Sequence, residues 1–219
     1  MPILTESGSA LTTFWLERVD STQKEAGRRL ENTPPPFAVV ADVQTQGQGS
    51  RGNRWEGEVG NLFFSFAVAR ASLPDDLKLE SSSIYFAFLL KEVLARRGSN
   101  TWLKWPNDFY LDDRKIGGTI TTLRGDALIC GIGLNLCSAP EPFGIVDIDI
   151  SRKALLDDYF AILERFPKWK QIFRKYALEF ECNRRFQTHF GERSIPLEKA
   201  VLCEDGAVEC EGQRIYSLR

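Results

Sequence analysis

The amino-acid sequence predicts an α+β fold: a mixed, mainly antiparallel β-sheet with helices, followed by a small C-terminal β domain. Three observations predict it. Short runs of alternating apolar and polar residues dominate residues 101–135. The stretch Leu77–Arg97 instead repeats its apolar residues at helical spacing. From Gly191 onward the chain consists of short β-like pieces around turns, which predicts a separate small β unit.

The N-terminal part of the chain predicts two strands with a helix between them. Thr13–Val19 has the apolar and β-branched residues of a strand. A helix follows, because Thr22–Glu25 fits the T-x-x-E capping box. Three consecutive prolines at 34–36 end that helix, since proline cannot continue it. The next apolar run, Phe37–Gln44, predicts the second strand.

A glycine-rich loop follows the second strand. Residues 44–55 read QTQGQGSRGNRW, so Gly47, Gly49 and Gly52 form the G-x-G-x-x-G pattern of dinucleotide-binding loops. A loop of that type opens a helix, whereas the next regular segment, Asn61–Ala69, has the composition of another strand. The loop is therefore not of the Rossmann type, and it serves another anion or none.

The rest of the chain predicts one long helix, a strand meander and two further helices. Leu77–Arg97 is the long helix, and Gly98 suits its C-terminal cap. The runs TWLKW, DFYL, KIGGTITTL and ALICGIGLNL are separated by short turns, which favours antiparallel neighbours. Helical stretches follow at 152–166 and 167–182. The short tail after them is too small to bury a core alone, so we expect it to dock on the main domain.

Composition argues against several classes of function. The 28 basic and 30 acidic residues give a net charge of −2, which provides no general attraction to nucleic acid. No run of about 20 apolar residues is present, and the N-terminal segment lacks a secretory pattern, so we expect a cytoplasmic protein. A single histidine, His189, and five cysteines without a C-x-x-C pair argue against a histidine base, a zinc site or disulfides. Chemistry must then rest on lysine, arginine, carboxylates, backbone amides or a hard cation.

Four motifs occur in order: DST at 20–22, GQGSRGNRW at 47–55, KWPNDFYLDDRKIGG at 104–118 and GIGLN at 131–135. Together they resemble the biotin–protein ligases, also called biotin–[acetyl-CoA-carboxylase] ligases. KWPND followed by DRK-x-x-G is highly specific to that family. The resemblance implies a sheet with helices on one side, of the class II aminoacyl-tRNA synthetase and biotin synthetase-like type, plus a small C-terminal β domain.

The resemblance also implies a two-step reaction. Biotin and ATP, with Mg²⁺, form biotinyl-5′-AMP and pyrophosphate, and a lysine of a biotin carboxyl carrier protein then takes the acyl group. Residues 1–183 are the expected catalytic biotin- and ATP-binding domain, and residues 184–219 the small β domain. Some members carry an N-terminal winged-helix repressor domain; only 19 residues precede Asp20, so we expect no DNA binding. We also expect no membrane contact. The sequence leaves open whether two chains form a homodimer.

Chemistry and resemblance together nominate the site residues. Joining a carboxylate to an α-phosphate requires cationic and hydrogen-bond donors that neutralise charge on the transferred phosphate. The expected catalytic residues are Lys115 and Arg51. The expected biotin contacts are Ser21, Thr22, Gln23, Gln44, Gly47, Gln48, Gly49, Ser50, Lys115, Gly118, Gly131 and Gly133. The expected ATP or adenylate contacts are Arg51, Trp55, Lys104, Asn107, Lys115 and Asn135, and Asp108 is a candidate Mg²⁺ ligand.

For each of these residues, a purely structural role is the alternative to a role in ligand binding. Ser21 and Thr22, at a helix N-terminus, can hydrogen-bond the ureido group of biotin or only cap the helix. Trp55 can stack on adenine or pack in the core. Lys115 can enter a strand directly after a tight turn or be a solvated surface residue. Asp108, in a P-N-D turn, is more often bonded to its own backbone than to a metal.

The glycine loop departs from the usual family pattern, GRGRRGRxW. Gln48 and Ser50 stand where two arginines are usual, and the arginine of the Ser50 position is the one expected to touch the biotin carboxylate and phosphate. We expect Arg51 to supply the missing charge. Arg51→Ala should then raise the dissociation constants of biotin and of the adenylate severalfold, because a charge-assisted hydrogen bond contributes roughly 1.5 to 3 kcal/mol. An unchanged affinity in a binding titration would exclude this role.

Three rival functions remain open at the level of sequence. A lipoate or octanoate ligase shares the fold and the adenylate chemistry, and the acid that the protein accepts distinguishes it. A non-catalytic module that binds biotin or an acyl-adenylate is suggested by the thinned arginine loop. Gln23, where asparagine is usual, is a milder departure from the family pattern. A dinucleotide-binding protein is disfavoured by the missing helix after the glycine loop.

Overall fold

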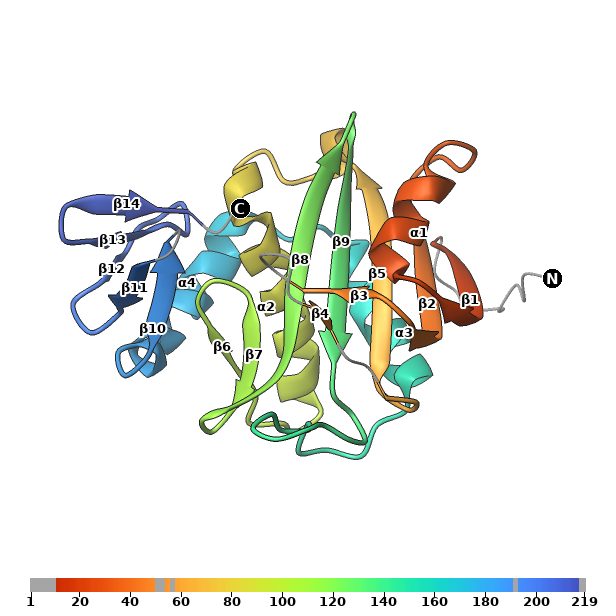
Figure 1. The fold of residues 1–219 in the computed structure, drawn as a ribbon. Coiled ribbons are helices and arrows are strands. Elements are labelled where there is room, and N and C mark those ends of the chain that lie inside the picture. The colour runs from red at the N-terminus through yellow and green to blue at the C-terminus, as the bar shows by residue number, and fades with distance from the viewer. Residues whose placement is uncertain (1–10, 50–53, 56–57, 191–192, 217–219) are drawn as a thin grey trace.

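The main layer of the protein is a seven-stranded sheet (Figure 1) in the order β1-β2-β5-β9-β8-β7-β6. The structure is a computed structural model that describes residues 11–49, 54–55, 58–190 and 193–216. The strands of this sheet are β1 (Thr12–Val19), β2 (Phe37–Gln44), β5 (Leu62–Ala69), β6 (Trp102–Lys104), β7 (Asp108–Leu111), β8 (Arg114–Arg124) and β9 (Ala127–Leu134). β1 and β2 pair in parallel, and the other neighbours pair antiparallel. The predicted mixed, mainly antiparallel sheet is confirmed.

Helices lie on both faces of this sheet, unequally. The α-helices are α1 (Thr22–Arg29), α2 (Ser82–Arg96), α3 (Arg152–Leu163) and α4 (Trp169–Glu179). Figure 1 shows α2 and α3 behind the sheet, with α4 beside α2, and α1 in front. The expected helical layer on one side is confirmed for α2, α3 and α4, and α1 is an addition on the other side. It lies there because it is the crossover between the parallel strands β1 and β2.

The two faces bury apolar residues from alternate positions of the same strands. Phe37 and Val39 of β2 pack with Ala26 of α1, whereas Ala38 and Val40 belong to the larger core under α2 and α3. This alternation follows from the two-residue period of a strand. The face that carries α1 is only partly covered by this helix, and that leaves room for a ligand site.

The start of α1 differs from the predicted capping box by one residue. The N-cap is Ser21, whose hydroxyl accepts a hydrogen bond from the Lys24 N–H at 3.5 Å. Thr22, the predicted cap, is already helical, and its backbone N–H and its hydroxyl both donate to Gln44 Oε1. The Thr22 side chain is therefore bonded to Gln44 on β2 and does not cap α1, the role that the local pattern predicted.

The C-terminal segment folds as the expected short strands. These are the hairpin β10 (Gln187–Phe190) and β11 (Arg193–Pro196) and the sheet β12 (Val201–Leu202), β13 (Val208–Cys210) and β14 (Gln213–Ile215). Leu197, Val208 and Ile215 are buried in the same core cluster as the residues of α2 and α4. The tail thus docks on the main domain, and the exact domain boundary after Asn183 stays a prediction.

Two further expectations concern cysteine pairing and membrane-spanning helices. All five cysteines are unpaired. Within the described ranges, no helix is long and apolar enough to cross a membrane.

Candidate active site

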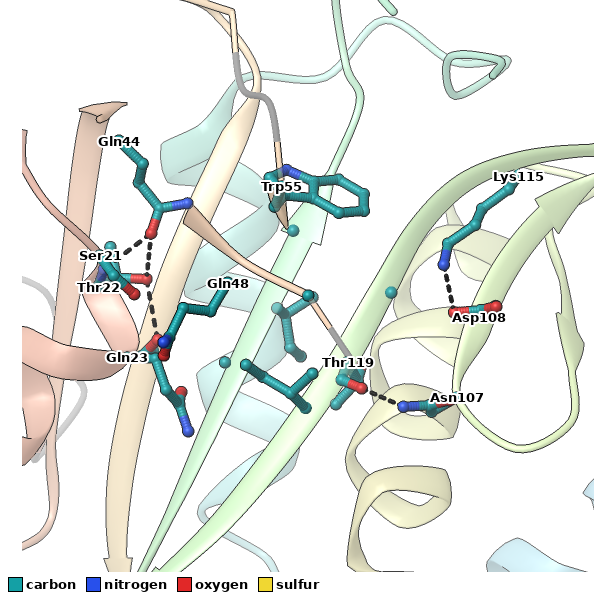
Figure 2. Close-up of a pocket in the computed structure, with 17 residues that line it drawn as sticks. Ser21, Thr22, Gln23, Gln44, Gln48, Trp55, Asn107, Asp108, Lys115 and Thr119 are labelled. Carbon is teal, nitrogen blue, oxygen red and sulfur yellow. Dashed lines mark hydrogen bonds and ion pairs between the residues drawn. The ribbon is translucent and has the colours of Figure 1, made fainter. Parts of the chain in front are cut away.

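A cavity lies on the α1 face of the sheet, where two short strands cross it (Figure 2). These strands are β3 (Gly47–Gln48) and β4 (Arg54–Trp55), which pair antiparallel. The cavity is narrow, about 40 Å³, and is partly open to solvent. Its lining consists of Ser21, Thr22, Gln23, Gln44, Gln48, Gly49, Trp55, Ser65, Asn107, Asp108, Lys115, Gly118, Thr119, Ile120, Gly131, Ile132 and Gly133.

The structure brings most of the nominated residues to this one cavity. The exceptions among the described residues are Gly47, Lys104 and Asn135, which do not line it. Ser50 and Arg51 lie outside the described residues. The sequence prediction missed Ser65, Thr119, Ile120 and Ile132. Ser65 carried a signal that could have found it, because it is the polar residue in the otherwise apolar strand LFFSFAVA.

One end of the cavity is built from a directed chain of hydrogen bonds. Ser65, fully buried in β5, donates through Oγ to Thr22 Oγ1 at 2.9 Å. The Thr22 hydroxyl and backbone N–H donate in turn to Gln44 Oε1, at 3.1 and 2.8 Å. Because Gln44 Oε1 accepts both bonds, its Nε2 is the end that stays available as a donor. Figure 2 shows Thr22 and Gln44 side by side at the left of the cavity.

Gln23 offers the opposite kind of group at the same end. Its Nε2 donates to the carbonyl of Ile129 at 3.2 Å and to Thr122 Oγ1 at 3.3 Å. A carbonyl can only accept, so this contact assigns the nitrogen and leaves Oε1 on the cavity side. Gln23 Oε1 is buried and has no hydrogen-bond partner in the part of the chain that the structure describes. A buried acceptor of this kind is suited to a ligand N–H.

Asp20 fixes the loop that carries Ser21 and Thr22. Its Oδ1 accepts the Ser21 N–H at 2.8 Å and forms an ion pair with Arg28 at 2.6 Å. The hydrogen bond from Arg28 lowers the pKa of Asp20 to about 2, and burial opposes this shift without reversing it. The carboxylate therefore stays ionised at neutral pH and holds the start of α1 in place.

The other end of the cavity carries the charged groups. Lys115 Nζ lies 2.6 Å from Asp108 Oδ1, and each side chain is about one quarter exposed. Asp112, with a φ of 49°, marks the tight turn before β8. Lys115 is the second residue of that strand. Beside this pair, Asn107 and Thr119 are joined through Asn107 Nδ2 and the Thr119 carbonyl, and through the Thr119 N–H and the Asn107 carbonyl. The result is a cation held on a rigid strand at the rim of the cavity.

Two glycines make room in the middle of the cavity. A methyl group on Gly133 would lie 2.8 Å from the Trp55 indole, and one on Gly131 would overlap Gln23 Oε1. Trp55 thus packs flat against β9 and lines the cavity, and its Nε1 is buried with no partner among the described atoms. Only glycine permits this approach to the sheet. Stacking of Trp55 on adenine stays a prediction.

The structure places Lys104 and Asn135 in other surroundings. Lys104 Nζ lies 5.5 Å from the ring centres of Tyr110 and Phe186. Asn135 donates through Nδ2 to the Gly144 carbonyl at 3.0 Å and so closes the loop after β9. Both side chains already have local partners away from the cavity, and an ATP contact by either one stays a prediction.

The match to known families agrees with this geometry. A family model described as the biotin/lipoate A/B protein ligase family matches residues 15–135, more than half of the 219-residue chain. The chain therefore belongs to this family, and the resemblance predicted from its four motifs is confirmed.

Solved structures and curated relatives narrow the comparison. The chain is similar to the biotin acetyl coenzyme A carboxylase synthetase of Helicobacter pylori, solved with bound biotinylated ATP: 36% identity, TM-score 0.89, covering 94% of this chain and 99% of that one. It is also similar to the biotin protein ligase of Aquifex aeolicus in complex with biotin and ATP, with 28% identity, TM-score 0.77, and 95% and 96% covered. The bifunctional ligase/repressor BirA of Bacillus spizizenii is 28% identical over 131 residues, or 57% of this chain. That match covers 40% of BirA, so the chain spans less than half the length of this relative.

Proposed function

We propose that this chain is an ATP-dependent biotin–protein ligase. It forms biotinyl-5′-AMP from biotin and ATP, and then transfers biotin to a lysine of a biotin carboxyl carrier protein, a carboxylase subunit. The observation that carries the proposal is the pairing of groups at the buried end of the cavity. Gln44 Nε2 is available as a donor, and Gln23 Oε1 is an acceptor without a partner among the described residues. A cyclic urea, with one carbonyl and two N–H groups, satisfies both.

The same pairing separates biotin from lipoate, the acid of the nearest rival function. The dithiolane ring of lipoate has no N–H, so it would leave Gln23 Oε1 buried and unpaired. An unsatisfied buried acceptor costs about 1 to 3 kcal/mol, which corresponds to roughly fivefold to 150-fold in affinity. The polar end of the cavity therefore favours biotin.

Lys115 is the residue that we assign to the charge chemistry. The adenylation step joins the biotin carboxylate to the α-phosphate of ATP, and negative charge accumulates on the phosphate oxygens. Lys115 points its ammonium group toward the cavity from a rigid strand, where a preorganised cation stabilises that charge most effectively. Arg51, outside the described residues, stays the predicted second cation.

Magnesium fits this site as a partner of the nucleotide. Asp108 is the one carboxylate in the lining of the described cavity, and the described residues contain no cluster of three or more potential metal ligands. Mg²⁺ is commonly held by one or two carboxylates together with substrate phosphates, so Asp108 would be its protein ligand. When bound, the ion supplies further neutralisation of phosphate charge. A cytoplasmic location, the lack of DNA binding and a homodimer stay predictions.

The proposed function is tested by intact-mass measurement of a purified biotin-carrier domain after incubation with this protein, ATP and Mg²⁺. Biotin and lipoate are supplied in separate reactions. A biotin-sized gain on the carrier, with none from lipoate, is the expected result. A gain from lipoate alone would establish the rival ligase. Binding of biotin without any gain would leave a non-catalytic binding module.

Gln23→Met tests the selectivity argument, because it removes the unpaired acceptor and provides an unbranched apolar side chain of similar length. Biotin should bind roughly fivefold to 150-fold more weakly, because one of its N–H groups loses an acceptor. Lipoate affinity should stay the same or rise. Isothermal titration with both acids measures the ratio, and an equal loss for the two would show that Gln23 only shapes the cavity.

A further inference from the structure

Three side chains of the main domain donate hydrogen bonds to the turn between β12 and β13. Trp105 Nε1 donates to the Gly206 carbonyl at 2.9 Å, and Trp169 Nε1 donates to the Glu204 carbonyl at 2.8 Å. Between them, Ser81 Oγ donates to the Asp205 carbonyl. Both indoles are buried, and the bond from Trp105 to Gly206 is shielded from water. Three successive carbonyls of the C-terminal unit are thus bonded to three separate segments of the main domain.

The backbone conformation and the ion pairs of this turn suit these three hydrogen bonds. Gly206 has a φ of +81°, and a methyl group there would lie 2.9 Å from Ser81 Oγ, so only glycine fits. Asp205 pairs with Lys78 at 2.9 Å and with Arg214 at 2.8 Å. Burial raises the pKa of Asp205, but these hydrogen bonds outweigh it and the net pKa falls from 3.8 to about 2. Its charge therefore stabilises the folded turn above pH 3.8, and this contribution is lost as the pH falls through about 2.

Trp105 is also held through its backbone by the segment that leads into the C-terminal strands. The Trp105 N–H donates to Asn183 Oδ1 at 2.6 Å, and Asn183 Nδ2 donates to the Leu103 carbonyl at 3.2 Å. Asn183 is fully buried, so both bonds are inside the protein. The backbone and the indole of Trp105 are therefore positioned by residues that lie about 80 to 100 positions further along the chain.

The residues directly after Trp105 reach the charged end of the cavity. Asn107 is bonded to Thr119 in both directions, and Asp108 forms the ion pair with Lys115. Only Pro106 separates Trp105 from Asn107. A shift of Trp105 would move Asp108 relative to Lys115. The buried end of the cavity, by contrast, is built on α1, β2 and β5, through Thr22, Gln44 and Ser65.

We infer that the C-terminal β unit positions the Asp108–Lys115 pair, and that Trp105 is the positioning residue that transmits this support. The inference rests on the proposed function for its kinetic consequence. Loosening Trp105 slows adenylation, because a small misplacement of a catalytic group lowers the rate strongly. It leaves biotin affinity unchanged, because the groups that bind the ureido ring are supported elsewhere.

The two tryptophans provide a matched pair of variants. Trp105→Phe and Trp169→Phe each delete one indole bond to the same turn and keep an aromatic ring. In Trp105→Phe, the rate of biotinyl-AMP formation at saturating ATP should fall about tenfold to 100-fold, with the biotin dissociation constant unchanged. Trp169→Phe should lose thermal stability but keep the wild-type rate below its melting temperature. Equal rate losses in both variants, or a wild-type rate in Trp105→Phe, would overturn the inference.

Amide hydrogen exchange supplies a readout that does not depend on activity. Trp105→Phe should raise exchange in residues 107–111 and leave α1 and β2 unchanged, whereas Trp169→Phe should leave residues 107–111 protected. If the wild-type protein formed no biotinyl-AMP, the proposed function would fail while this comparison still decided the positioning role. If Trp105→Phe did not fold, Asn183→Ser would remove the acceptor of the Trp105 N–H instead. Unchanged exchange at residues 107–111 in that folded variant would equally overturn the inference.

Discussion

Lys115→Ala is expected to lower the rate of biotinyl-AMP formation by about 100-fold to 1,000-fold, the range seen when one preorganised donor to a developing anion is removed. Lys115 is the cation in the lining of the described cavity, and it lies on strand β8. Biotin affinity should change much less, since the groups proposed to bind the ureido ring lie at the other end of the cavity. Pyrophosphate release measures the rate, and calorimetry measures the affinity.

Two controls sharpen this prediction. Lys153→Ala removes the same charge from the exposed face of α3, where the lysine pairs with Asp157, and it should leave the rate unchanged. Lys115→Ala also leaves Asp108 as an unpaired carboxylate that repels phosphate. Lys115→Arg keeps a cation beside Asp108 and should therefore retain part of the rate that Lys115→Ala loses. A Lys115→Ala enzyme with a rate near that of the wild type would remove Lys115 from the catalytic role.

Gly131→Ala is expected to weaken biotin binding about 100-fold while the protein stays folded. The added methyl group overlaps Gln23 Oε1 and lies 3.0 Å from Ser65 Oγ. Gln23 cannot easily move away, because its Nε2 is bonded to the Ile129 carbonyl. The methyl group therefore displaces the acceptor and fills space needed by the ring, a loss of about 2 to 3 kcal/mol. Gly131 lies in β9 without a positive φ, so alanine is compatible with the strand backbone.

Gly27→Ala is the matched control for this glycine. It is buried in α1, but a methyl group there meets only the guanidinium end of Arg124, an exposed and flexible side chain that can move aside. Alanine is favoured over glycine inside a helix by about 1 kcal/mol, so stability should stay the same or rise. Biotin binding should match the wild type. Calorimetric titration of both variants tests the pair, and equal affinities for Gly131→Ala and the wild type would place biotin elsewhere.

Local patterns in the sequence were sufficient for most of the architecture. The strand meander of 101–135 and the helix that ends at Arg96 depend on side-chain periodicity and backbone preference, which act over a few residues. The motifs also nominated Lys115, Gln23 and Gln44, because each lies in a short stretch with a recognisable resemblance. The α1 cap is the place where a local rule was overridden, since Thr22 is bonded to Gln44 on β2.

The tertiary structure decided how those nominated groups are oriented. Sequence named Gln23, but the contact with Ile129, 106 residues away, determines that its oxygen and not its nitrogen faces the cavity. Ser65 joined the site only through Thr22, 43 residues away, and Lys104 lies beside the rings of Tyr110 and Phe186 and is absent from the cavity lining.

Sequence alone therefore determined the family, the main strands and helices and most of the residues around the cavity. The tertiary structure alone decided the directions of the hydrogen bonds at the buried end and the support of Trp105 by Gly206. The physical reason is distance along the chain. Trp105 and Gly206 are 101 residues apart, and such a bond depends on how whole elements pack, which no local pattern of residues encodes.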